Sequence, residues 1–377
     1  MQRPPSSWLS RDDRTTLALW LASRVAIGVG AIYASWLLLP VTAQFHSWTE
    51  LNRPVLTPIY MWRQWDVYWY TGIAERGYGS AGLETAWAFM PGLPTLMGLA
   101  GRVGVPAVHA GLIISFVAGA VACLGLARLA VPSGSIGSRA VLAWVASPYA
   151  LFLFVPYAEA LFCAFAFWSW VVARNGQWIA AGALASAATL VRVNGVFLAV
   201  ALGVLLLTTQ RTKWRHGWAL LLPIASLLGY VAFGWLVTGN WTVWLASQAE
   251  GWDREFAWPW GAAANTVIAM VDAPTTAEAV SFLFESVGAV VLVALVVWLL
   301  AVRRWAEATL VGLTAMALLT NEVWYSVFRS TLVLFPLWVL LGLWMTRNRF
   351  FAMGYVAVCG PLMVVAAVGY TNAMWIG

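Results

Sequence analysis

The chain has 377 residues, of which 62% are hydrophobic and only 10% are charged, whereas about 25% of the residues in a typical soluble domain are charged. This composition excludes a soluble protein. The net charge is +6, but the cations form no basic tail, so no nucleic-acid partner is expected. The three cysteines lie inside apolar stretches without CxxC spacing, so neither a disulfide framework nor a zinc site is predicted.

Apolar segments follow one another with short polar breaks from Thr15 to the C-terminus. Because a helix needs about 20 apolar residues to cross a bilayer, the sequence predicts an all-α, polytopic membrane protein that forms a single domain over residues 1–377. The first segment lacks a small-residue cleavage site and is predicted to be a retained span, not a signal peptide. About 11 transmembrane helices are expected, at residues 15–39, 106–127, 140–156, 157–173, 178–191, 195–209, 217–238, 285–302, 305–320, 330–346 and 350–370.

The charges between these segments predict their orientation. If the N-terminus is cytoplasmic and every segment crosses once, the cytoplasmic loops receive most of the Lys and Arg residues, as the positive-inside rule requires. A crossing by residues 90–104 would break this alternation at Arg128, so this piece is predicted to be re-entrant or to lie on the outer surface. Several segments are too short to cross upright, which indicates broken helices that face a cavity. Boundaries that are wrong by a few residues are the alternative.

Two long outer segments, at about 40–105 and 239–284, are dense in Trp, Tyr and charged residues. Long loops usually carry function or are disordered, and disordered segments are poor in aromatic residues, so both segments are predicted to fold against the membrane surface. The first contains an apolar stripe at helical spacing, which predicts an amphipathic helix with its aromatic face in the headgroup layer. This stripe consists of Trp62, Trp65, Trp69 and Ile73.

Two acids in or near these outer segments are candidates for chemistry. Asp66 lies between two tryptophans at the predicted membrane surface, where a carboxylate is costly unless it has a partner or a task. We predict that Asp66 is a general base that faces an aqueous cavity; a salt bridge to Arg63 or a capping role is the alternative. Glu159 falls near the outer end of a short span and is the second candidate, with pairing to Arg192 as its structural alternative.

Three outer arginines near the ends of apolar segments are candidates for binding a phosphate: Arg192, Arg254 and Arg329. A guanidinium binds phosphate through two parallel hydrogen bonds, which suits the headgroup of a phosphorylated lipid. A snorkelling anchor is the alternative for each of them. The chain has neither a phosphate-binding loop nor a dinucleotide-binding glycine motif, so a nucleotide substrate is not expected. Its three scattered histidines indicate no metal, and no cofactor is expected.

The outer segments and span ends contain a series of motifs, which occur in the order WDVYWYTGIAERGY, AWAFMPGLP, SPYALFLFVPYAEALF, TLVRVNG, a loop with Gln and Trp that ends in WPW, and FRSTLVLFP. This order resembles the PIG-V family, whose eukaryotic members are the second GPI mannosyltransferase of the endoplasmic reticulum and which has shorter bacterial relatives. The resemblance runs from about residue 60 to residue 336. The short chain and its preference for Arg over Lys fit a bacterial member.

This resemblance implies a GT-C glycosyltransferase fold and a polyprenyl-phosphate sugar donor, usually with mannose. In such enzymes an acid of the first outer loop serves as base, which would be Asp66. The chain departs from the pattern at Ala158, where the family tends to have serine, and at Val67, where many GT-C enzymes have a second acid. The predicted donor or phosphate ligands are Arg192, Arg329, Arg254, Tyr157, Glu159 and Asn194, and the predicted sugar or acceptor contacts are Trp65, Trp69, Gln248 and Trp252. For the tryptophans, interfacial anchoring or core packing is the alternative.

One carboxylate is sufficient for transfer from a lipid phosphate, because a phosphate leaves readily once its charge is stabilised. Together with this chemistry, the resemblance implies an inverting mannosyltransferase, which moves mannose from polyprenyl-phosphate-mannose to a lipid-linked or cell-envelope glycan acceptor. The expected location is the extracytoplasmic face of a bacterial plasma membrane. Membrane lipids are its other expected partners. The alternatives are a GT-C enzyme for another polyprenyl-phosphate sugar and, from a different class, a lipid or sugar transporter.

Overall fold

The computed structural model describes residues 10–42, 59–130, 134–252 and 254–376. Within these ranges the secondary structure is helical, apart from an isolated antiparallel bridge between Phe256 and Asn321. The predicted all-α class is therefore confirmed.

Within the described ranges, five helical stretches are long and apolar enough to cross a membrane by length and composition. A sixth candidate consists of Val327–Val333 and Phe335–Arg347, which are bent by 79° relative to each other. The predicted total of about 11 spans also counts shorter helices and stays a prediction. The five long stretches belong to α1 (Arg11–Thr42), α4 (Ala107–Leu129), η4 and α9 (Arg211–Leu221 and Leu222–Thr238), α12 (Thr276–Ala301) and α16 (Arg349–Thr371).

Shorter helices occupy the remaining predicted spans. Helices α7 (Trp178–Val191) and α8 (Gly195–Thr209) have the same bounds as two of the predicted segments. At 1.5 Å per residue, each of these helices is shorter than the roughly 30 Å of a bilayer core, which agrees with the prediction that several spans are too short to cross upright. The others are α5 (Gly134–Val145), α6 (Ala158–Arg174), α13 (Trp305–Leu319) and α15 (Phe335–Arg347).

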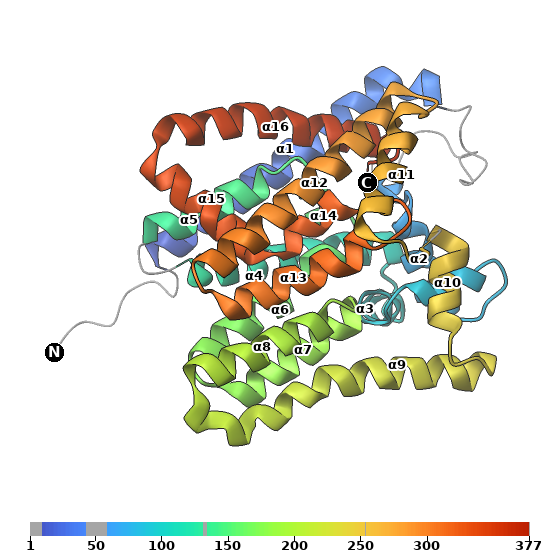
Figure 1. Ribbon diagram of the computed structural model, residues 1–377. Coiled ribbons are helices and arrows are strands. Elements are labelled where there is room, and N and C mark those ends of the chain that lie inside the picture. Colours follow the sequence, from blue (N-terminus) through green and yellow to red (C-terminus); the bar gives the residue numbers. More distant parts are fainter. Residues whose placement is uncertain (1–9, 43–58, 131–133, 253, 377) are drawn as a thin grey trace.

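The outer segments form short helices that lie together on the right of the bundle in Figure 1, with α14 near its centre. Residues 90–104 contain α3, which has ten residues and is too short to span, as predicted. Residues 43–58 of the first outer segment lie outside the described residues. The helices of the two outer segments are η1 (Tyr60–Trp62), α2 (Asp66–Arg76), η2 (Glu84–Ala88), α3 (Gly92–Gly101), α10 (Val243–Trp252) and α11 (Pro259–Val271). Three further short helices are η3 (Ala150–Leu153), α14 (Val327–Ser330) and η5 (Thr331–Val333).

The apolar stripe of the first outer segment differs from its prediction. Helix α2 begins only at Asp66, because Trp62 lies in η1 and Trp65 has a left-handed φ of 53° that separates the two helices. Trp62 and Ile73 are buried in the protein core, and the ring of Trp62 lies 4.9 Å from that of Phe154. This part of the stripe therefore packs into the protein instead of facing the headgroup layer, since the same spacing also suits packing between helices.

The end of the bundle opposite the outer helices is held by ion pairs between predicted cytoplasmic residues. Arg128 at the end of α4 lies 2.6 Å from Asp13 in α1, and Arg174 at the end of α6 lies 3.6 Å from Glu307 in α13. Glu307 also pairs with Arg304. The acids and cations that the charge alternation assigns to one side thus meet at one end of the structure. The face of the membrane to which this end belongs stays a prediction.

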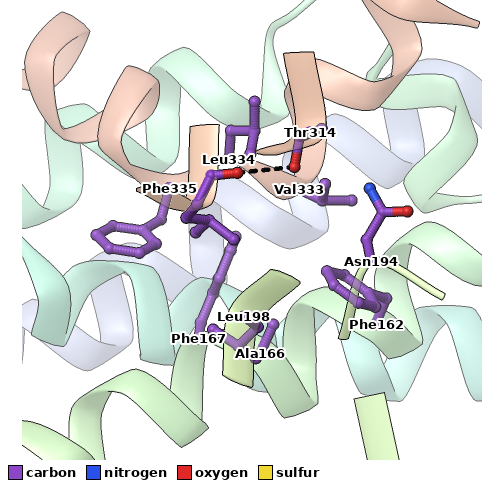
Figure 2. A pocket seen from close by; sticks show the side chains of 10 residues that line it. Phe162, Ala166, Phe167, Asn194, Leu198, Thr314, Val333, Leu334 and Phe335 are labelled. Atoms are coloured by element: carbon purple, nitrogen blue, oxygen red, sulfur yellow. Dashed lines mark hydrogen bonds between the residues drawn. The ribbon is translucent and has the colours of Figure 1, made fainter. Parts of the chain in front are cut away.

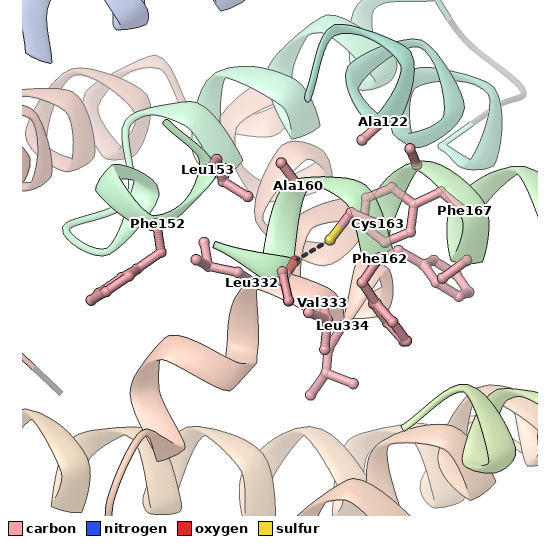
Figure 3. Close-up of a cluster of buried hydrophobic side chains, with 14 of the residues drawn as sticks. Ala122, Phe152, Leu153, Ala160, Phe162, Cys163, Phe167, Leu332, Val333 and Leu334 are labelled. Carbon is pink, nitrogen blue, oxygen red and sulfur yellow. Dashed lines mark hydrogen bonds between the residues drawn. The ribbon is translucent and has the colours of Figure 1, made fainter. Parts of the chain in front are cut away.

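The core depends on close helix contacts at small residues. A Cβ atom on Gly119 of α4 would lie 2.1 Å from the ring of Trp20 in α1, so only glycine allows this approach. Figure 3 shows the core between α6 and η5, where the thiol of Cys163 donates to the carbonyl oxygen of Leu332 at 3.7 Å. This contact joins η5, which follows α14, to α6 in the centre of the bundle.

Candidate active site

A cavity of about 1060 Å³ lies among the outer helices. It is lined by the start of α2, the break between α7 and α8, the end of α10, the start of α14 and the C-terminal residues. Every predicted site residue except Glu159 lines it: Asp66, Arg192, Arg254, Arg329, Tyr157, Asn194, Trp65, Trp69, Gln248 and Trp252. The structure thus brings together residues that are dispersed over most of the sequence.

Asp66 is the first residue of α2 and lies at the positive end of that helix, which favours a carboxylate. The preceding Trp65 adopts a left-handed backbone with φ 53° and ψ −125°, which is strained for a residue with a side chain. The backbone N–H of Asp66 donates to the Tyr157 Oη at 3.2 Å. The start of α2 is therefore fixed by a residue from the predicted site, and the Asp66 side chain stays 18% exposed towards the cavity.

A chain of four alternating charges begins at Asp66. Its Oδ2 lies 3.3 Å from Nη1 of Arg329, whose Nε lies 3.3 Å from Oε1 of Glu159. The same oxygen of Glu159 accepts from Nη1 of Arg192 at 2.5 Å. Glu159 is fully buried and orients both guanidinium groups, so its pairing with Arg192 is confirmed. The predicted alternative of an Asp66–Arg63 salt bridge is wrong, because Arg329 takes that position.

Arg329 is held in place by the start of α14. The backbone N–H groups of Ser326, Val327 and Phe328 donate to the buried carboxylate of Glu285 in α12, at 2.9, 2.5 and 3.0 Å. Ser326 has a left-handed φ of 62° that turns the chain into this contact. The Arg329 guanidinium also lies over two aromatic rings, 5.0 Å from Phe152 and 5.3 Å from Tyr157, a favourable cation–π arrangement.

Arg192 reaches the site because the chain breaks between α7 and α8. A Cβ atom on Gly195 would lie 2.4 Å from the backbone nitrogen of Thr189, so the tight reversal after α7 requires glycine. Asn194 lies in this break and lines both the large cavity and a small apolar pocket of about 10 Å³, which Figure 2 shows. Its amide is thus placed at the boundary between the site and the core.

Arg254 adds a third cation to the site. Burial, followed by the nearby charges of Arg329 and Arg192, lowers the pKa of Arg254 to about 10, and Asp66 opposes this effect. Burial raises the pKa of Asp66, while Arg329 lowers it. With Arg192, Arg254 and Arg329 against Asp66 and Glu159, the site has one positive charge in excess. A phosphate is complementary to such a group of guanidinium ions.

Aromatic side chains form the wall beside Arg254. The ring centre of Trp69 lies 6.2 Å from that of Phe89 and 6.0 Å from that of Trp252, and the ring centres of Phe89 and Trp252 are 5.1 Å apart. Gln248 donates from Nε2 to the carbonyl oxygen of Ala88 at 3.1 Å, which fixes α10 against η2. Such a wall offers flat apolar surface on which a sugar ring can stack.

Other residues that line the cavity were not predicted from the sequence. Arg63 lines the cavity, as do Glu278, Tyr325, Asn372 and Trp375. The sequence offers Arg63 only as a partner for Asp66, and the other four belong to no motif of the resemblance. A polar and aromatic stretch after the last predicted span was the signal that could have indicated the C-terminal residues.

Among known proteins, the chain has a relative in sequence and a neighbour in structure. No protein-family model matches the chain. The chain is 24% identical over 221 residues to GPI mannosyltransferase 2 of Schizosaccharomyces pombe, and the match covers 56% of this chain but only 47% of that protein. The chain therefore spans about half the length of this relative. This similarity agrees with the expected resemblance to a glycosyltransferase, and the expected bacterial membership of the PIG-V family stays a prediction.

Among solved structures, the chain is similar to the archaeal oligosaccharyltransferase AglB from Archaeoglobus fulgidus, which was determined in complex with an inhibitory peptide and a dolichol-phosphate. The TM-score is 0.45 and the sequence identity is 12%, over 96% of this chain and 56% of AglB.

Proposed function

We propose that the chain is a GT-C glycosyltransferase that transfers mannose from polyprenyl-phosphate-mannose to a lipid-linked or cell-envelope glycan acceptor. The observation that carries this proposal is the position of the Asp66 carboxylate in one cavity with Arg192, Arg254 and Arg329. The choice of mannose is supported by the similarity to a protein named GPI mannosyltransferase 2. The charge alternation of the sequence supports the extracytoplasmic face for the reaction, and the preference for Arg over Lys supports a bacterial plasma membrane.

The proposed reaction is a single displacement. The acceptor hydroxyl transfers its proton to the Asp66 carboxylate while its oxygen forms a bond to the anomeric carbon of the sugar. The bond between that carbon and the phosphate oxygen breaks, and the phosphate leaves on its lipid carrier with the bonding electron pair. Because one face of the sugar is attacked and the other is vacated, the anomeric configuration inverts. The raised pKa of Asp66 makes its carboxylate a stronger base than an exposed one.

The three arginines have different tasks in this proposal. Arg329 is paired with Asp66 and Glu159, so it orients the base as well as facing the phosphate. Within the described part of the chain, Arg254 forms no ion pair with a carboxylate and is the cation most in need of an anion. Stabilising the charge that develops on the leaving phosphate is the largest effect available to such a site. The aromatic wall beside Arg254 would hold the sugar next to that phosphate.

The test is transfer by the purified protein. Incubation with polyprenyl-phosphate-mannose and a membrane lipid extract is expected to add a hexose to a lipid, detected by mass spectrometry. Asp66→Asn should lower the rate by about 100-fold to 10,000-fold, the usual range for a general base. Asp272→Asn is the matched control, since Asp272 is exposed and does not line the cavity.

Three outcomes would revise the proposal. Normal transfer by Asp66→Asn would remove the proposed base. Transfer from a glucosyl or arabinosyl polyprenyl phosphate, without transfer from the mannosyl one, would change the donor sugar. Uptake of the donor into proteoliposomes without formation of any glycoside would replace the enzyme with a transporter.

A further inference from the structure

A second group of side chains lines the same cavity as the aromatic wall of Trp69 and Trp252. It combines a guanidinium, an amide, a carboxylate and two aromatic rings, a mixture that can bind both a sugar and a charged group. Its members come from the segment before α2, the start of α12, the segment before α14 and the C-terminal residues: Arg63, Glu278, Tyr325, Asn372 and Trp375.

Arg63 is the cation of this group, and the described residues provide no ion pair for it. Its Nε atom is buried and has no hydrogen-bond partner there. The backbone on either side is fixed, because Tyr370 Oη donates to the carbonyl oxygens of Trp62 and Gln64 at 3.2 and 2.9 Å. A partly buried cation without a partner is unfavourable. This arrangement therefore favours an anion supplied by a ligand.

The two rings of the group form a rigid platform. Tyr325 and Trp375 have their ring centres 5.4 Å apart, and both pack against Phe282 of α12, at 5.9 and 5.2 Å. The hydroxyl of Ser281 donates to the carbonyl oxygen of Trp375 at 3.0 Å and fixes the C-terminal segment. Aromatic surface held in this way at a cavity wall suits the apolar face of a sugar ring.

Along the chain, Asp66 lies between a residue that contacts the C-terminal segment of this group and a residue of the aromatic wall. One residue before it, Trp65 donates from Nε1 to the carbonyl oxygen of Met374, beside Trp375. Three residues after it, Trp69 belongs to the aromatic wall. The cavity volume of about 1060 Å³ lies at the upper end of the roughly 300–1,000 Å³ range of ligand pockets, which leaves room for a large ligand. A base between two walls of so large a cavity is placed to act between two reactants.

We propose that the second group is the acceptor subsite, and that Arg63 binds a phosphate or carboxylate of an acidic glycolipid acceptor. This inference rests on the proposed function, because the proposed function assigns the donor to the aromatic wall of Trp69 and Trp252. Among the described residues, Arg63 takes no part in the ion pairs that link Asp66, Arg329, Glu159 and Arg192, which leaves Arg63 outside the donor cluster. The acceptor class is therefore an anionic glycolipid, and a neutral one is disfavoured.

The first test separates acceptors by charge. A membrane lipid extract is divided by anion exchange into acidic and neutral fractions, and each is offered with polyprenyl-phosphate-mannose to the wild type and to Arg63→Gln. Hexose is expected in the acidic fraction, and Arg63→Gln should raise the KM for that fraction by about tenfold or more, as loss of a charged hydrogen bond does. The KM for the donor should change less than twofold, roughly the effect of a neutral surface change.

The controls distinguish charge from folding. Arg76→Gln removes an exposed arginine of α2 that does not line the cavity and should leave both constants unchanged. Arg63→Lys keeps the positive charge and should restore most of the affinity for the acidic fraction. Hexose only in the neutral fraction, or an equal rise of both KM values in Arg63→Gln, would overturn the proposal.

A binding experiment separates failure of this inference from failure of the proposed function. Thermal unfolding of the wild type in detergent is measured with dioctanoyl phosphatidylglycerol, dioctanoyl glucuronosylglycerol and neutral dioctanoyl glucosylglycerol. An anionic probe should raise the midpoint of the wild type and not that of Arg63→Gln, and comparison of the first two separates phosphate from carboxylate. This result would support the anion site even if no transfer were found. Equal shifts in both proteins would refute it.

Discussion

The three hydrogen bonds that Glu285 accepts from the start of α14 predict that a change of one atom at this position disturbs the site. Glu285→Gln keeps the shape of the side chain and replaces one carboxylate oxygen with an NH₂ group. Oε2 accepts from Val327 and Phe328, and Oε1 accepts from Ser326. The best orientation of the amide keeps the first two bonds and turns its NH₂ group towards the N–H of Ser326.

The loss of one of the three hydrogen bonds sets the size of the effect on stability. One bond to a charged acceptor is lost, which costs about 1.5–3 kcal/mol, and the remaining bonds weaken because the acceptor is no longer ionised. The free energy of unfolding should fall by at least this amount. The transfer rate should fall even where the variant is fully folded, because Arg329 lies two residues beyond Val327 and depends on α14 for its contact with Asp66.

The assay is denaturant unfolding in detergent, followed by tryptophan fluorescence, together with the transfer rate at a temperature where both proteins are folded. Glu75→Gln, on the exposed face of α2, is the matched control. Glu285→Ala should be less stable than Glu285→Gln, since it loses all three bonds. If Glu285→Gln unfolds and transfers like Glu75→Gln, the carboxylate does not hold α14 and the reasoning fails.

Two further predictions concern the break between α7 and α8 and the base. Gly195→Ala should lower the free energy of unfolding by about 1–3 kcal/mol, because the new methyl group would overpack against the backbone nitrogen of Thr189, 2.4 Å away. Gly203→Ala on the same helix meets nothing within 4 Å and should leave the stability unchanged. Equal unfolding midpoints for the two variants would contradict this prediction. Because ionised Asp66 is the proposed base and burial raises its pKa, transfer should fall as the pH decreases through a value above the ordinary 3.8, as a profile of kcat/KM can show. Arg329 lowers that pKa, so Arg329→Gln should move the acid limb to higher pH, and a move to lower pH would refute the assignment.

Much of the fold follows from local features of the sequence. The bounds of α7 and α8 coincide with the predicted segments, because their apolar runs are interrupted by the polar residues Gln177, Arg192 and Gln210. The prediction that the apolar stripe around Trp62 faces the headgroup layer is wrong, because Trp62 and Ile73 are buried in the protein. Its spacing shows that one face is apolar but does not show whether lipid or protein covers that face.

The sequence by itself determined the helical class, the apolar segments and the residue types available for chemistry, because periodicity and composition are local properties of the chain. Only the tertiary structure decided which charges meet. Asp66 pairs with Arg329, 263 residues away, and not with the neighbouring Arg63. Such a partnership depends on how separate helices pack and on which positions they remove from water. Neither property can be read from spacing along the chain.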